Sequence, residues 1–194
     1  MRGKFLLVVG PSGSGKDTLI KHARSVFPDL GISVSPTTRA PRPGEEGGVD
    51  YHFLTEEEFK RRIEAGDFLE WAQYGGNYYG TLRSEVMPAV EAGKFVISDI
   101  EVQGARQILS SIPNDVIVFY IDSGPWESLV ERIRARAPIS DEELTKRYER
   151  YQDELSFKKD AHYVITNENG KLEEAKAAFV AAIEAIRKDA GDAK

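Results

Sequence analysis

The chain has 194 residues, 41% of them hydrophobic and 30% charged, which is enough for one domain with a well-buried core. A formal net charge of -6 excludes a general attraction to nucleic acid or to an anionic membrane, and the absence of cysteine excludes disulfides and thiolate metal sites. We see neither a signal peptide nor an apolar run near the ~18 residues that span a membrane, and therefore expect a cytoplasmic location.

A glycine-rich turn follows the first apolar run, residues 5–9, and precedes a helical pattern that runs from residue 16 to about residue 27. Glycine lets consecutive backbone N–H groups converge on phosphates at the N-terminus of a helix, and a lysine at this spacing reaches the β- and γ-phosphates. The turn therefore predicts a loop that binds a nucleoside triphosphate. It reads Gly10-Pro11-Ser12-Gly13-Ser14-Gly15-Lys16-Asp17-Thr18.

Asp17 departs from the usual form of this loop, in which a Ser or Thr hydroxyl at that position ligates Mg²⁺. A carboxylate is also a suitable Mg²⁺ ligand, either directly or through water. Without a cation between them, however, the carboxylate and the triphosphate repel each other. Asp17 therefore either contacts the metal or leaves that role to Thr18, and the sequence leaves both readings open.

Three further β-rich runs follow, at residues 95–100, 116–121 and 163–166. Helical patterns at residues 126–135, 140–157 and 172–188 alternate with them, and this alternation predicts an α/β fold with a parallel sheet flanked by helices. Two capping boxes, beginning at Thr55 and Ser140, predict helix starts. We expect residues 189–194 to be disordered.

Residues 32–93 differ in character and predict a sub-domain inserted into the α/β core. Residues 31–48 contain three prolines and four glycines, which is typical of a shaped surface loop. Arg39 and Arg42 lie three apart in this stiff segment, so their guanidinium groups either bind a phosphate or are simply solvated.

Five segments together resemble the guanylate kinases, enzymes that transfer the γ-phosphoryl group of ATP to GMP. The resemblance implies the three-layer fold of P-loop NTPases in a single domain. Its core would comprise about residues 1–31, 94–130 and 156–190, with a GMP-binding sub-domain at about 32–93 and a short helical lid at about 131–155. It also implies Mg²⁺ as cofactor and activity toward dGMP as well as GMP. The segments are GPSGSGK, SVSPTTRAPRPGE, GVDYHF, FLEWAQYGGNYYGT and DIEVQGARQI.

The resemblance also implies roles for individual residues. Glu70 and Thr81 would read the guanine base, because guanine presents two donors on one edge and adenine does not. Asp99 and Glu101 match acidic positions near the metal and the base, although the family usually has Asp at the second. The phosphate of GMP would be held by Ser35, Arg39, Arg42, Tyr51 and Tyr79. The lid would supply Arg132, Arg136 and Arg147, and Asn167 matches a position on the adenine side. Catalysis would depend on Lys16, Arg39 and the three lid arginines, and Asp17, Thr18 and Asp99 are the candidate Mg²⁺ ligands.

Two other readings stay open from the sequence. Ribose 1,5-bisphosphate phosphokinases resemble this chain in having Asp after the loop lysine, but their substrate has no guanine for Glu70 to recognise. Guanylate-kinase-like interaction modules have lost the phosphate loop, which is intact here. We expect small-molecule substrates, no nucleic-acid or membrane partner, and a monomer or homodimer.

Overall fold

The computed structural model describes residues 2–136 and 138–192, with the backbone alone for Arg136 and Asp192. Five parallel strands form the central sheet in the order β2-β7-β1-β8-β9. Every residue of the middle strand is apolar and buried, as expected for a strand covered on both faces. The expected α/β fold is confirmed. The five strands are β1 (Phe5–Val9), β2 (Gly31–Ile32), β7 (Val96–Asp99), β8 (Val116–Asp122) and β9 (Tyr163–Thr166).

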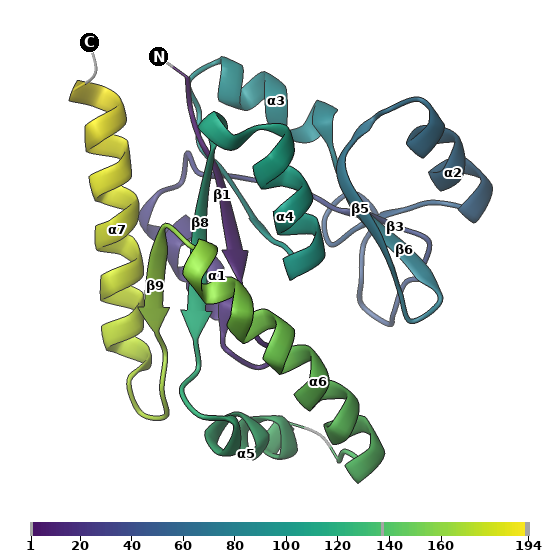
Figure 1. Ribbon diagram of the computed structural model, residues 1–194. Helices are drawn as coiled ribbons and strands as arrows, with labels where there is room; N and C mark the ends of the chain where they lie inside the picture. Colours follow the sequence, from purple (N-terminus) through teal and green to yellow (C-terminus); the bar gives the residue numbers. More distant parts are fainter. Residues whose placement is uncertain (1, 137, 193–194) are drawn as a thin grey trace.

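Helices cover both faces of this sheet and produce three layers (Figure 1). Because side chains alternate along a strand, Leu6 and Val8 pack with helices α1 and α7, whereas Leu7 and Val9 pack with α3 and α4 on the opposite face. The helices are α1 (Lys16–Val26), α3 (Arg83–Glu91), α4 (Val102–Ser111) and α7 (Leu172–Asp192), with short 3₁₀ turns at Pro113–Asp115 and Lys158–Asp160.

A second sheet of four strands, in the order β4-β3-β6-β5, lies beside the central sheet (Figure 1). It has a small core of its own, in which the rings of Phe59 and Phe68 stack with centroids 4.6 Å apart. Thr55 caps helix α2 as its motif predicts, accepting a hydrogen bond from the Glu58 N–H at 3.1 Å. The elements are β3 (Pro36–Thr37), β4 (His52–Phe53), α2 (Glu56–Glu64), β5 (Phe68–Tyr74) and β6 (Asn77–Leu82).

Helices α5 (Trp126–Arg136) and α6 (Asp141–Phe157) pack against each other, with α5 below the central sheet in Figure 1 and α6 running up from it alongside the strands. Leu129 and Ile133 of α5 pack against Leu144 and Tyr151 of α6. The predicted cap of α6 is present, because the Ser140 hydroxyl accepts a hydrogen bond from the Glu143 N–H. The division into core, sub-domain and lid stays a prediction.

Three details differ from the sequence-based expectation. The helices α3 and α4 were not predicted. Pro88 lies inside α3 and Gly104 inside α4, and each of these residues weakens a helical pattern. The segment 31–48, expected to be irregular, contributes the two-residue strands β2 and β3. Helix α7 extends to Asp192, so the expectation of disorder was wrong for residues 189–192, which continue its hydrogen bonding; residues 193–194 lie outside the described part. No helix in the described ranges is long and apolar enough to cross a membrane.

Candidate active site

The loop between β1 and α1 is shaped by glycines. Gly10, Gly13 and Gly15 have positive φ angles of 147°, 92° and 94°, a region that residues with a side chain rarely adopt. At Gly10 a Cβ atom would also lie 2.6 Å from the carbonyl oxygen of Ile121 on the neighbouring strand. The loop therefore has the local geometry that the motif predicts, at the carboxyl end of the central strand.

Lys16, the first residue of α1, turns its ammonium group back over this loop. Its Nζ donates hydrogen bonds to the Gly10 carbonyl at 2.6 Å and the Pro11 carbonyl at 3.3 Å, and lies 3.8 Å from Asp99 Oδ1. Both of these hydrogen bonds go to neutral carbonyl groups, and Asp99 is the nearby carboxylate. A positive charge held in this way remains available to an incoming anion.

A cavity of about 850 Å³ opens beside the loop and brings together residues from distant parts of the chain. Acidic and basic groups both line it, so it can accept a polyanion together with a cation. The predicted site residues that it gathers are Ser12, Gly13, Gly15, Lys16, Asp17, Thr18, Arg42, Asp99, Glu101, Arg132 and Arg147.

The carboxylates of Asp17 and Asp99 both line this cavity. The Asp99 side chain is 42% exposed to the cavity, yet the surrounding protein removes enough solvent to raise its pKa to about 6, and the charge of Asp17 contributes to the shift. No cluster of three or more His, Cys, Asp or Glu side chains suited to a metal occurs in the ranges described. This donor set fits Mg²⁺, which takes one or two carboxylates and fills its remaining positions with water and substrate phosphates.

The predicted phosphate-binding residues of the acceptor side lie in the second sheet and in the segments that adjoin its strands. Arg39 Nη2 donates to both carboxylate oxygens of Glu45, at 2.8 and 3.0 Å, and the guanidinium lies 5.3 Å from the centroid of the Tyr51 ring. The Tyr51 and Tyr79 rings are 6.2 Å apart, and burial raises the pKa of the Tyr51 hydroxyl. Ser35 is half-buried at the start of the same segment, where its carbonyl accepts from the His52 N–H at 3.0 Å.

Glu70 and Thr81 lie opposite each other on β5 and β6, next to an irregularity in the ladder between Phe68 and Glu70. Glu70 is only 7% exposed, and its Oε1 accepts a hydrogen bond from the Thr81 hydroxyl at 2.8 Å. Burial raises the pKa of Glu70 to about 7, and the nearby charge of Glu101 adds to that rise. A buried carboxylate with capacity for further hydrogen bonds is a suitable acceptor for two donors on the edge of a base.

Gly104 on α4 makes room for this carboxylate. A Cβ atom at Gly104 would lie 2.5 Å from Glu70 Oε2, so any side chain there would displace it. Sequence reasoning did not single out Gly104 for this role. The signal was its place in the DIEVQGARQI segment, where a glycine interrupts a helical pattern.

Two of the three predicted lid arginines are positioned by contacts within the site. Arg132 donates to the carbonyl of Asn167 at 2.6 Å and to Asn169 Oδ1 at 2.5 Å. Arg147 donates to Ser12 Oγ at 3.4 Å and to Glu143 Oε1 at 2.7 Å. The side chain of Arg136 lies outside the described part of the structure.

Asn167 has a different placement from the other predicted residues. It is 4% exposed, and its side-chain amide donates to the carbonyl of Ser14 at 2.7 Å. The buried hydroxyl of Ser14 has no hydrogen-bond partner among the described residues. In this structure the side chain of Asn167 therefore holds the phosphate loop in place through its hydrogen bond to Ser14.

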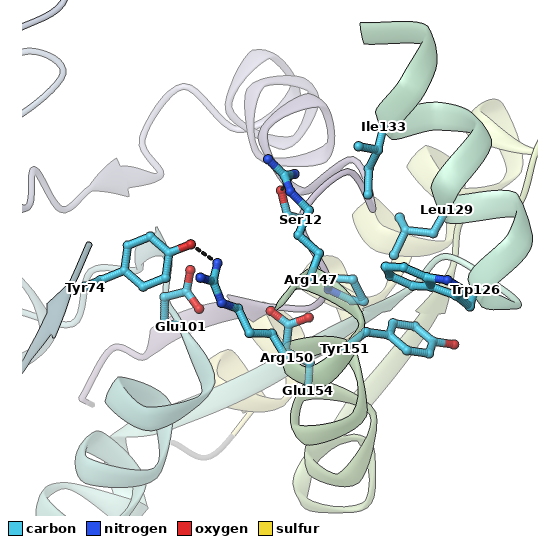
Figure 2. Close-up of a pocket in the computed structure, with 11 residues that line it drawn as sticks. Ser12, Tyr74, Glu101, Trp126, Leu129, Ile133, Arg147, Arg150, Tyr151 and Glu154 are labelled. Carbon is cyan, nitrogen blue, oxygen red and sulfur yellow. Dashed lines mark hydrogen bonds between the residues drawn. The ribbon is translucent and has the colours of Figure 1, made fainter. Parts of the chain in front are cut away.

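Figure 2 shows a smaller cavity of about 110 Å³ between α6, the phosphate loop and β5. Three of its lining residues were missed by sequence reasoning: Tyr74, Arg150 and Glu154. Arg150 and Glu154 lie three and seven positions after Arg147, a spacing that places them on one face of a helix and could have revealed them. Burial raises the pKa of Glu154 to about 7. Glu101 lines both cavities.

The fold has three layers with a parallel sheet in the middle, and its phosphate loop is shaped by glycines and carries a lysine. Together with the adjoining site and its buried carboxylate, these features define a P-loop nucleotide kinase. The family model described as guanylate kinase matches residues 2–186. The chain therefore belongs to the guanylate kinase family, whose members are nucleoside monophosphate kinases.

Individual relatives agree with this assignment. A guanylate kinase from Synechococcus sp. (strain JA-3-3Ab) is 45% identical over 174 residues, covering 90% of this chain and 79% of the relative. One from Thermotoga maritima is 41% identical over 187 residues, covering 96% and 89%. The crystal structure of guanylate kinase from Anaplasma phagocytophilum superimposes with a TM-score of 0.74 at 28% identity, covering 96% of this chain and 87% of that one.

Proposed function

We propose that this chain transfers the γ-phosphoryl group of ATP to GMP, and to dGMP, giving ADP and the nucleoside diphosphate. The observation that carries the proposal is the buried Glu70 carboxylate, hydrogen-bonded to Thr81 and electrostatically coupled to Glu101, which also lines the cavity at the phosphate loop. A site with that acceptor rejects a base that lacks matching donors, because the carboxylate would be left buried and unpaired.

ATP would bind at the loop of residues 10–18, in the larger cavity. The backbone N–H groups of the glycine turn and the ammonium of Lys16 would hold its phosphates. Asp17 and Asp99, with Thr18 as a third oxygen donor, would hold Mg²⁺ there, and when bound the metal neutralises part of the phosphate charge. Without the metal, the Asp17 carboxylate would repel ATP, and for this reason we expect binding of ATP to depend strongly on the metal.

GMP would bind between the second sheet and the ends of β7 and α4. Arg39 and Arg42, with the Tyr51 and Tyr79 hydroxyls and Ser35, would hold its phosphate, while Glu70 and Thr81 would contact the guanine. The pairing of Arg39 with Glu45 supports this role, because it holds the guanidinium in one orientation before the phosphate arrives.

The acceptor phosphate is itself a nucleophile near pH 7, so the reaction needs no dedicated general base. Catalysis then consists of positioning the two phosphates and stabilising negative charge. Lys16, Arg132 and Arg147 surround the cavity where that charge develops, and we propose that Arg136 joins them. Closure over both substrates would keep the phosphoryl group from water.

Release of ADP from Mg·ATP, measured with one acceptor at a time, tests the proposal. The panel comprises GMP, dGMP, AMP, UMP, CMP and ribose 1,5-bisphosphate. We expect turnover with the guanine nucleotides alone. Turnover confined to ribose 1,5-bisphosphate, or none with any acceptor, would refute the proposal and revive the other kinase or the interaction module, neither of which the family comparisons favour.

We further propose a cytoplasmic location and a monomer or homodimer, with small molecules as the partners. The moderate acidic charge supports the absence of a nucleic-acid partner. Sedimentation of the purified chain with and without Mg·ATP would measure the oligomeric state.

A further inference from the structure

A contact between Arg150 and Tyr74 bridges the lid helix and the second sheet. Arg150 Nη1 donates a hydrogen bond to the Tyr74 hydroxyl, drawn as a dashed line in Figure 2. The guanidinium carbon of Arg150 also lies 4.5 Å from the centroid of the Tyr74 ring. Both residues line the smaller cavity between the phosphate loop and the end of β5. The pair therefore joins two regions that are 76 residues apart in the chain.

The same face of α6 contacts the phosphate loop. Arg147, one turn before Arg150, donates to Ser12 Oγ at 3.4 Å. Residues three apart on a helix are neighbours on its surface, so a shift of α6 moves both arginines together. The position of Arg147 at the loop is thus mechanically linked to the contact between Arg150 and Tyr74.

Tyr74 in turn touches the acceptor site. Its ring meets the Tyr79 ring edge-on, with centroids 6.5 Å apart, and Tyr79 lies next to Tyr51 and Arg39. A continuous set of contacts therefore runs from Ser12 on the donor side, through α6, to the residues that we assign to the phosphate of GMP.

We propose that Arg150 and Tyr74 are positioning residues that latch the lid helix to the acceptor sheet and thereby couple the binding of the two nucleotides. The inference rests on the proposed function, which places ATP on one side of the latch and GMP on the other. Neither residue contacts the reacting atoms. Each acts through its neighbour, Arg150 through Arg147 and Tyr74 through Tyr79.

The latch predicts a coupling between the binding affinities of the two nucleotides. Because the latch holds α6 against the acceptor sheet, a nucleotide that fixes one of these regions also favours the binding position of the other. Each nucleotide should then bind more tightly when the other is present, and by the same factor. Breaking the latch should reduce this coupling while leaving the affinity for each nucleotide alone nearly unchanged. A residue with a merely structural role would instead weaken both individual affinities or the stability.

Titration calorimetry measures the coupling directly. The dissociation constant of GMP is determined alone and in the presence of a saturating, non-hydrolysable ATP analogue with Mg²⁺, for the wild type and for Arg150→Ala, Arg150→Lys and Tyr74→Phe. We expect Arg150→Ala to reduce the coupling factor by about fivefold or more, within the usual range of such couplings. Tyr74→Phe keeps the ring beneath the guanidinium and loses the hydrogen bond, so a smaller loss is expected. Arg150→Lys, which keeps the charge, should restore part of it.

Matched controls come from the same helix. Lys146→Ala removes an exposed cation that pairs with Glu142 one turn away, and Tyr148→Phe removes a tyrosine hydroxyl from a side chain that is 44% exposed, as is Tyr74. Both should keep the wild-type coupling factor. The double variant Arg150→Ala/Tyr74→Phe should lose no more coupling than Arg150→Ala alone.

The proposal is overturned by a wild-type coupling factor near one, by unchanged coupling in Arg150→Ala and Tyr74→Phe, or by fully additive losses in the double variant. If Arg150→Ala perturbs the fold, the test rests on Tyr74→Phe, which removes only the hydroxyl that accepts the hydrogen bond from Arg150. The acceptor panel on the wild type tests the proposed function separately, because calorimetric coupling requires no turnover.

Discussion

We assign the phosphates of ATP to the loop of residues 10–18, the donor loop, and the phosphate of GMP to the second sheet, the acceptor sheet. The two regions are built differently. The loop uses backbone N–H groups and one lysine from nine consecutive residues, and its shape follows from three glycines with positive φ. The acceptor sheet uses side chains from separate strands, together with Glu101 and Gly104 from the central fold. Local sequence therefore determines the first region, whereas tertiary packing has to assemble the second.

The two regions also differ in how they hold charge before a ligand binds. Lys16 donates its hydrogen bonds to carbonyl groups and lies 3.8 Å from Asp99 Oδ1, while Arg39 donates from Nη2 to both oxygens of Glu45 and from Nη1 to the Ala40 carbonyl. The donor cation is thus free to meet phosphate directly. The acceptor cation is oriented by an internal anion, and incoming phosphate must share it.

Removing the donor cation should have the largest effect. We expect Lys16→Ala to reduce kcat by at least about 10²- to 10³-fold, because charge on the transferring phosphoryl group loses a preorganised partner. Steady-state ADP release measures it. Lys60→Ala, which removes an exposed cation from α2, is the control and should retain full activity. A Lys16→Ala variant with wild-type kcat would show that the loop is not the donor site.

Neutralising Glu70 should break the acceptor side selectively. Glu70→Gln replaces one acceptor oxygen with an N–H₂ donor that opposes the donors of guanine, so kcat/KM for GMP should fall by about 10²-fold. The KM for ATP should stay within about twofold. The ratio of GMP to AMP turnover should also drop. An unchanged ratio would contradict the assignment of Glu70 to base recognition.

A smaller change tests the shape of the same pocket. Gly104→Ala would place a Cβ atom against Glu70 Oε2, and the carboxylate is the flexible partner that has to move. We expect KM for GMP to rise by about tenfold, and the free energy of unfolding to fall by about 1–3 kcal/mol because the pocket is overpacked. Gly191→Ala on α7, where a Cβ would meet open space, is the matched control. Equal KM values for the two variants would show that Gly104 does not set the position of Glu70.

Much of the molecule could be predicted from the sequence, and the reasons are local. The middle strand is apolar at every position, and the phosphate loop and the caps at Thr55 and Ser140 are short motifs with fixed spacing. The helix that contains Pro88 was missed because its local signal contradicts its structure, and packing of Val86 and Val90 against the sheet overrides that signal.

The residues of the acceptor site could be predicted only from the resemblance to a family. Nothing local in the sequence pairs Glu70 with Thr81, and their opposition depends on an irregular ladder between β5 and β6. Tyr74 and Arg150 were missed altogether, since their meeting depends on where the lid helix packs.

The acidity of Glu70 gives the finest test of the comparison, because its carboxylate is the group that we assign to the guanine base. Burial raises the pKa of Glu70 to about 7, and only the ionised form accepts both donors of guanine. The KM for GMP should therefore fall by up to about tenfold as pH rises from 6 to 8. GMP and Asp99 titrate in the same region, so the informative quantity is the difference between the wild type and Glu70→Gln, in which that fall should be lost.

The stability of the protein should depend on pH in the opposite direction. A carboxyl group that keeps its proton more tightly in the folded state stabilises that state at low pH, and this contribution is lost as pH rises from its ordinary value of 4.5 to about 7. Relative to Glu70→Gln, the wild type should thus lose thermal stability over this window, in the absence of nucleotide. Saturating GMP should reverse the trend, because the base supplies the hydrogen-bond donors that the ionised carboxylate lacks. A stability difference that does not change with pH would mean that Glu70 is already ionised in the free protein, and that its carboxylate needs no deprotonation before guanine binds.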